Sequence, residues 1–189
     1  MPEKLSPTFL TPRRLRRVSA RDEVTRIIAG AVLDFVKRVC ECERIKEIHA
    51  KDLELAKVAD EVTAAISEGR EGVFGPVAVK VQKKFLGRRE IKALLFGREV
   101  NVDTLLSEVS KAKSRAAWIA NDCSDRALIE SLYKGEDRYL IEVVQRNFEK
   151  FKYVCLGRNP EIDFGDAPPH VVDGVKKGIS SYLSHGVSS

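Results

Sequence analysis

Residues 21–44 read RDEVTRIIAGAVLDFVKRVCECER. Apolar side chains recur along this stretch at intervals of three and four, which is the pattern of one amphipathic helix of about six turns. The apolar positions are Val24, Ile27, Ile28, Ala31, Val32, Phe35, Val36, Val39 and Cys42. Ser19 can cap this helix, and Asp22 and Glu23 suit its first turn. A helix with so long an apolar face needs a partner of similar length.

Residues 101–123 supply a second long helix with the same spacing. Its apolar face consists of Val102, Leu105, Leu106, Val109, Ala112, Ala116, Ile119, Ala120 and Cys123. Trp118 is expected in the core because it follows this spacing. Shorter helices are predicted at residues 5–17, 49–68, 77–86, 126–133 and 136–148, with Gly69 and Gly87 as stops. No strand longer than a few residues is predicted, so the expected fold class is all-α, with a short–long–short motif that occurs twice.

The composition excludes several classes of protein. The chain has 189 residues, of which 43% are hydrophobic and 32% are charged, and this fits neither a disordered nor a collagen-like chain. Residues 153–189 are rich in glycine and proline, so they are expected to form an extended arm rather than a domain. No stretch reaches the roughly 18 apolar residues of a membrane span and no signal peptide opens the chain, so an intracellular or packaged protein is expected.

The basic residues gather in two clusters, although the net charge is only +5. The first cluster is Arg13, Arg14, Arg16, Arg17 and Arg21, and the second is Lys80, Lys83, Lys84, Arg88, Arg89, Lys92 and Arg98. Two separate cationic clusters indicate a polyanionic partner.

The four cysteines are too few and too scattered to predict a disulfide framework, so free thiols in a reducing compartment are expected. Cys40 and Cys42 would point to different faces of a helix, and ordinary packing is favoured over a zinc site. His49, His170 and His185 have no partners at a recognisable catalytic spacing, and no glycine-rich phosphate loop follows a strand. The sequence predicts no enzyme, no metal, no cofactor and no small-molecule substrate.

A long helix between two short ones, occurring twice, resembles the histone fold. Residues 48–56 and 61–69 are similar to the second loop and the extra C-terminal helix of the type two-B core histone. Residues 74–87 and 132–140 are similar to the first and third helices of type two-A, and residues 167–175 resemble its docking segment. Two core histones fused in this order resemble the histone doublets of Marseillevirus-like giant viruses. This chain has no long Lys-rich N-terminal tail and its second loops are short. In both respects it resembles a "mini" variant of these histone doublets.

This resemblance implies two histone folds paired as an intramolecular handshake, over residues 1–72 and 73–152, with an extended C-terminal docking arm at 153–189. It implies a structural protein that wraps duplex DNA without sequence specificity, in a nucleosome-like particle with a doublet of the other two core histones. The expected location is a virion and viral factory, or otherwise nucleus or chromatin; secretion and a membrane partner are not expected.

The implied DNA-binding residues are Arg13, Arg14, Arg16, Arg17, Lys46, Lys80, Lys83, Lys84, Arg88, Arg89 and Arg126. An acidic docking patch would consist of Glu68, Glu136 and Asp137. One alternative is a histone-fold interaction or transcription-factor module whose main partner is protein. Another is a single-strand or RNA-binding helical protein, which the low aromatic content of 7% disfavours.

Overall fold

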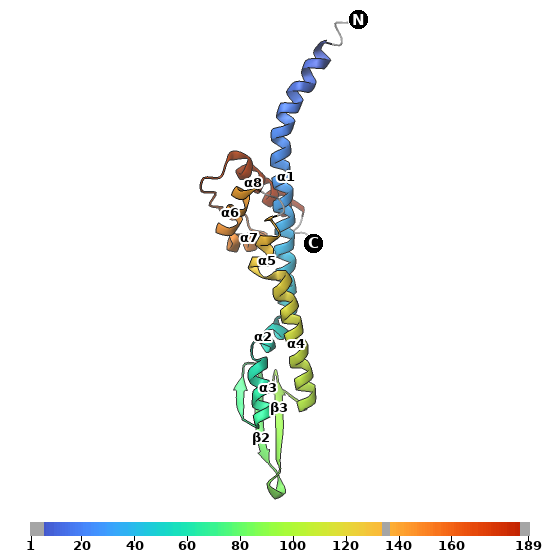
Figure 1. Cartoon of the computed structure of the whole chain (residues 1–189), viewed down its shortest axis with the longest axis vertical. Helices are drawn as coiled ribbons and strands as arrows, with labels where there is room; N and C mark the ends of the chain where they lie inside the picture. The colour runs from blue at the N-terminus through green and yellow to red at the C-terminus, as the bar shows by residue number, and fades with distance from the viewer. Residues whose placement is uncertain (1–5, 134–136, 186–189) are drawn as a thin grey trace. The chain divides into compact units, whose positions relative to one another are not determined.

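The computed structural model describes the backbone of residues 6–133 and 137–185, and the side chains of residues 22–133 and 137–185 (Figure 1). The chain folds into two compact units: unit 1 consists of Met1–Glu43 and Asp125–Ser189, and unit 2 consists of Arg44–Ser124. These boundaries differ from the expected ones at residues 72 and 152. A four-stranded antiparallel sheet lies within unit 2. The expectation of an all-α pair of histone folds is therefore wrong.

Unit 1 is helical. Its first helix, α1 (Ser6–Ile48), is continuous for 43 residues, and its last residues belong to unit 2. The two separate helices expected here are one, because the chain stays helical through Ser19. The other helices are α5 (Asp125–Glu130), α6 (Arg138–Arg146), α7 (Phe148–Val154) and α8 (Pro169–His185).

The core of unit 1 forms where α7 and α8 pack against α1. The Phe35 ring meets the rings of Phe148 and Phe151 edge to face, with centroids 6.1 and 5.5 Å apart. Such aromatic contacts add to the stabilisation from apolar burial. The described buried apolar side chains of α1 and α8 are Ile28, Val32, Phe35, Val36, Val39, Cys42, Val171, Val175 and Ile179.

The expected extended C-terminal docking arm is wrong, since residues 169–185 form α8. Pro169 occupies the first helical position, where the missing N–H costs nothing. Gly174 and Gly178 do not break the helix but let it approach α1 closely. A Cβ at Gly178 would lie 2.7 Å from the Cβ of Val32 and 2.8 Å from the carbonyl oxygen of Ala29. The glycines thus serve helix packing, although their number in the sequence suggested a loop.

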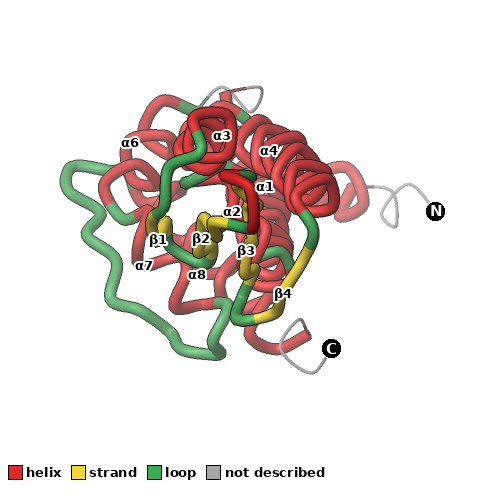
Figure 2. The backbone as a smooth tube through the Cα atoms, turned by 90° about the horizontal axis from the view of Figure 1, so that it is seen from below, coloured by secondary structure: helices red, strands yellow, loops and turns green. Residues whose placement is uncertain are grey.

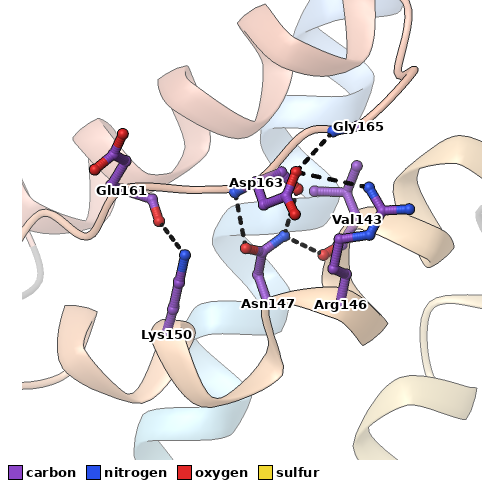
Figure 3. Close-up of polar contacts among 7 residues, drawn as sticks. All are labelled: Val143, Arg146, Asn147, Lys150, Glu161, Asp163 and Gly165. Atoms are coloured by element: carbon purple, nitrogen blue, oxygen red, sulfur yellow. Dashed lines mark hydrogen bonds and ion pairs between the residues drawn. The ribbon is translucent and has the colours of Figure 1, made fainter.

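The loop between α7 and α8 is fastened by the buried side chain of Asn147 (Figure 3). Its Nδ2 donates hydrogen bonds to the carbonyls of Val143 at 2.7 Å and Asp163 at 2.8 Å. Its Oδ1 accepts a hydrogen bond from the Asp163 N–H at 2.9 Å. Lys150 adds a hydrogen bond from its Nζ to the Glu161 carbonyl at 2.7 Å. The Asn147 amide therefore serves as the hydrogen-bond partner of both the N–H and the carbonyl of Asp163, a role that backbone groups have in helices and sheets.

The expectation of free thiols is wrong. Cys40 on α1 is disulfide-bonded to Cys155, directly after α7. Cys42 and Cys123 are also disulfide-bonded, so no cysteine is free. Spacing along the sequence could not show this, because a disulfide depends on the separation of two Cα atoms in space, here 5.4 Å.

Unit 2 combines three helices with the sheet. In chain order its elements are α2 (Ala50–Lys57), α3 (Ala59–Glu68), β1 (Gly72–Phe74), β2 (Val77–Lys83), a 3₁₀ turn (Phe85–Gly87), β3 (Arg89–Leu95), β4 (Arg98–Val100) and α4 (Val102–Cys123). Two predicted helix ends are confirmed: Gly69 ends α3 in a left-handed conformation, and Asn101 caps α4 by accepting a hydrogen bond from the Thr104 N–H at 2.7 Å.

The predicted helix at residues 77–86 is wrong, because these residues form β2 and the turn after it. Val77 and Val79 are buried, Ala78 between them is half-buried, and Lys80 after them is exposed. This alternation with a period of two matches a strand that has one covered face.

The strands are arranged in the order β1-β2-β3-β4, and α3 and α4 lie on the same side of the sheet (Figure 2). The buried core between them contains Leu55, Ala59, Val62, Val77, Val79, Ala93, Leu105, Val109 and Ala112. Trp118 on α4 lies outside this core with 51% of its surface exposed, so its predicted burial is wrong.

Candidate nucleic-acid interface

Residues 80–92, the distal part of the β2–β3 hairpin, form a feature that we call the basic hairpin. Its tip lies beyond the ends of α3 and α4 within unit 2 (Figure 1). Val81 and Ile91 face each other across the strands and are half-buried, whereas residues 82–89 form an unbroken exposed run. The hairpin therefore leaves the core just beyond the Val81–Ile91 pair and presents its tip to solvent.

The register of the two strands places like charges opposite each other. Lys80 pairs with Lys92, and Lys83 pairs with Arg89. Lys84 and Arg88 continue the pairing, since the Lys84 N–H donates a hydrogen bond to the Arg88 carbonyl at 2.6 Å. Directly opposed like charges destabilise a sheet. A polyanion bound along the hairpin would offset this repulsion.

The charge of the protein is concentrated in this hairpin. Residues 80–92 contain six basic side chains and one acidic side chain, Glu90, which gives a net charge of +5. The whole chain also has a net charge of +5, so the remaining residues together are neutral. A local excess of this kind attracts polyanions and accelerates their association.

Three described carboxylates lie against the hairpin: Glu90 and Glu99 form ion pairs with its lysines, and Glu71 accepts a hydrogen bond from the Val81 N–H at 2.8 Å. The Lys84 ammonium hydrogen-bonds to the Glu90 carboxylate and lowers its pKa, and the positive charges of Lys84 and Lys92 act in the same direction. Glu99 lies 3.8 Å from the Nζ of Lys92. Four further cations, Lys80, Lys83, Arg88 and Arg89, have no ion pair with any residue that the structure describes. Their charges are available to a ligand.

The tip also has an apolar part. Phe85 and Leu86 are 89% and 85% exposed, the highest values among the large apolar side chains described. Leu86 and Gly87 adopt positive φ angles of 69° and 74°. Leucine in the left-handed region is strained, because its Cβ approaches the following carbonyl oxygen.

The other predicted DNA-binding residues belong to other elements of the chain. Arg13, Arg14, Arg16 and Arg17 fall on α1, but their side chains lie outside the described residues. Lys46 lies in the last turn of α1. Arg126 on α5 donates a hydrogen bond to Glu130 at 2.8 Å, which raises the pKa of its guanidinium.

The structure describes two of the three residues of the predicted acidic patch, Glu68 and Asp137, and they belong to different units. Glu68, at the end of α3, is paired with Arg70 at 3.5 Å. Asp137 caps α6 by accepting hydrogen bonds from the Tyr139 and Leu140 N–H groups, and it lies 3.3 Å from His170. Glu136 lies outside the described residues. Glu68 and Asp137 thus have local structural roles in different units.

Reasoning from the sequence found the cations of the hairpin but not the apolar tip between them. The signal that could have found it is the alternation of Val77, Val79 and Val81, followed by a short turn and a second β-compatible run, which is typical of a hairpin. In a hairpin, Phe85 and Leu86 lie at the turn, where nothing covers them.

The described residues also bear on two other kinds of site, a membrane span and a metal centre. In the described part of the chain, no helix is long and apolar enough to cross a membrane. Within the same residues, no group of three or more His, Cys, Asp or Glu side chains is placed to hold a metal ion. Comparison with family models, curated proteins and solved structures found no match for this chain.

Proposed function

We propose that this protein binds duplex DNA through the basic hairpin, by contacts to phosphates rather than by reading the base sequence. The observation that carries the proposal is the register that holds Lys80 opposite Lys92 and Lys83 opposite Arg89 on an exposed ribbon. Like charges repel across the strands in the free protein, with only Lys92 partly neutralised by Glu99, whereas a phosphate backbone would neutralise the cations on both strands.

The shape of the hairpin favours a duplex over a single strand. A two-stranded β-ribbon can enter a groove of B-DNA, with phosphates lying on both sides of it. Binding of single strands normally relies on several aromatic side chains on which successive bases stack. Phe85 is the only aromatic residue in residues 80–92.

The proposal is limited to DNA binding. Wrapping of DNA in a nucleosome-like particle was implied by a histone handshake, and that fold is not observed. The cations of the basic hairpin do not depend on that fold, since β2 and β3 alone place them together.

The experiment measures the affinity of the full-length, oxidised protein for a 30-bp duplex by fluorescence anisotropy, between about 50 and 300 mM salt. Neutralisation of about five phosphates predicts a log–log slope near −4.5. Replacing Lys80, Lys83, Arg88 and Arg89 by alanine is expected to flatten this slope by about 3–4. Duplexes of different sequence should bind with similar affinity.

A matched control removes four exposed cations of unit 1, with the variant Arg26→Ala, Lys37→Ala, Arg38→Ala and Lys177→Ala. The change in net charge is the same, so an effect of total charge alone would be equal in both variants. If both variants lose the same slope, the basic hairpin is not the DNA site. If the wild type shows no salt-dependent binding, the alternative of a protein partner is favoured.

A further inference from the structure

The tip of the basic hairpin combines two features that seldom occur together on a protein surface. Phe85 and Leu86 are almost fully exposed, and Lys84 and Arg88 flank them directly. Water around a large apolar side chain is unfavourable, so two adjacent side chains of this kind at a turn indicate that they are covered when a partner binds.

The backbone of the turn adds a second observation. Leu86 has a φ of 69°, a conformation that glycine and asparagine adopt far more readily. Either residue would relax the turn and keep its shape. A leucine in this place is explained if its side chain, rather than its backbone, is needed at the tip.

We infer that Phe85 and Leu86 form a wedge that inserts between stacked base pairs of the bound duplex and kinks it. This inference rests on the proposed function. The preferred ligand is then DNA that is easily unstacked or already distorted. Apolar wedges of Phe and Leu unstack base steps in this way in proteins that bend DNA. Unstacking costs less free energy at a mismatch or a flexible base step. This difference makes the protein prefer DNA that contains such a step.

The cations on both sides of the wedge fit DNA better than a lipid bilayer. Each base step has a phosphate on either strand, so Lys84 on one side of the tip and Arg88 on the other can each meet a phosphate while the wedge lies between bases. Insertion of the same tip into a bilayer would bring both cations toward the hydrocarbon region, which is unfavourable for charged groups. The apolar part comprises only two side chains.

The test compares the wild type with the double variant Phe85→Ser, Leu86→Asn. Asparagine tolerates the left-handed conformation at position 86, so the turn and all cations of the hairpin are kept. Val73→Ser serves as the control, because Val73 is 79% exposed on β1 of the same sheet but lies away from the tip. Each protein is titrated with an intact 30-bp duplex and with the same duplex containing one mismatch. End-to-end energy transfer reports bending, and 2-aminopurine at the mismatch reports unstacking.

The wild type and Val73→Ser are expected to bind the mismatched duplex roughly tenfold more tightly than the intact one, with bending and a rise in 2-aminopurine fluorescence. The tip variant should bind both duplexes equally, without bending, and should keep the salt slope of the wild type. If the tip variant retains the preference and the bend, the wedge is refuted while the proposed DNA binding stands. A wild type without salt-dependent binding would refute the proposed function itself.

A parallel titration with vesicles of phosphatidylcholine and phosphatidylserine distinguishes the lipid alternative. If the wild type binds these vesicles, the tip variant does not, and both bind DNA alike, then the tip is a membrane contact and the inference is overturned. Absence of vesicle binding, together with a loss of bending in the tip variant, supports the wedge.

Discussion

Cys40 and Cys155 are joined by a disulfide across 115 positions of the sequence. The bond ties the C-terminal part of α1 to the end of α7, next to the aromatic contacts of Phe35 with Phe148 and Phe151. A cross-link between residues so far apart strongly restricts the unfolded chain, so it stabilises the folded state. The packing of α7 on α1 is thus maintained by a covalent bond in addition to apolar burial.

Replacing both cysteines, as in Cys40→Ser with Cys155→Ser, is expected to lower the free energy of unfolding of unit 1 by about 2–5 kcal/mol. Urea denaturation followed by tyrosine fluorescence and circular dichroism measures the change. Trp118 is the only tryptophan and lies in unit 2, so its fluorescence reports the other unit in the same sample. An unchanged urea midpoint in both signals would show that the disulfide adds nothing to stability.

The glycines of two helices are expected to respond in opposite directions to alanine. Gly178→Ala places a Cβ within 2.8 Å of the Ala29 carbonyl and of Val32, so α8 must move away from α1, at a cost of about 1–3 kcal/mol. Gly30→Ala on α1 meets no atom within 4 Å and should stabilise the helix by about 0.5–1 kcal/mol. Thermal denaturation of both variants checks the prediction. Equal shifts of Tm would contradict the close packing of α8 on α1.

Asn147→Ala is expected to lower the free energy of unfolding by about 2–3 kcal/mol, because the N–H and carbonyl of Asp163 lose their partners in a partly buried place. Limited proteolysis should then cleave within residues 155–168 faster than in the wild type. Lys150→Ala is the comparison, since it removes one exposed hydrogen bond to Glu161 from the same loop and should have a much smaller effect. Similar cleavage rates in the two variants would exclude a special role of Asn147.

Glu90→Gln is expected to strengthen DNA binding, because it raises the net charge of residues 80–92 from +5 to +6. The salt slope should steepen by about 0.9. Glu108→Gln, on α4 of the same unit, removes one carboxylate elsewhere and should leave the slope unchanged. If the salt slope responds equally to both substitutions, then the position of the removed carboxylate does not matter for DNA binding.

Comparison of the wild type with Glu90→Gln also gives a prediction about pH. The pKa of Glu90 lies below its ordinary value of 4.5, mainly because Lys84 hydrogen-bonds to the carboxylate. A lowered pKa means that the ion pair is fully present above the ordinary value and is lost only as the pH falls through the lowered one. The ratio of the DNA affinities of Glu90→Gln and wild type should therefore stay nearly constant from pH 8 to pH 4.5, where a carboxylate with the ordinary pKa would already be half protonated. A ratio that falls toward one within this range would contradict the lowered pKa.

Features that depend on neighbours along the chain follow from the order of the residues alone. Gly69 ends a helix because it adopts a left-handed conformation, and Asn101 begins α4 because its side chain accepts a hydrogen bond three residues ahead. The basic cluster at residues 80–92 is also a property of the sequence, although its charge alone does not show whether it lies on a helix or on a hairpin. These features need no distant contact.

The remaining features depend on tertiary contacts, because contacts between distant residues select between local alternatives. Residues 77–81 allow both a helix, with Val77 and Val81 four apart, and a strand, with Val77, Val79 and Val81 alternating; pairing with β3 and burial beneath α3 and α4 select the strand. Gly174 and Gly178 weaken a helix locally, yet close packing on α1 more than compensates. The disulfide between Cys40 and Cys155 likewise depends on how α1 and α7 meet in space. Exposure of Phe85 and Leu86 follows only once the hairpin is formed, so the proposed wedge is visible in the structure and not in the spacing of the sequence.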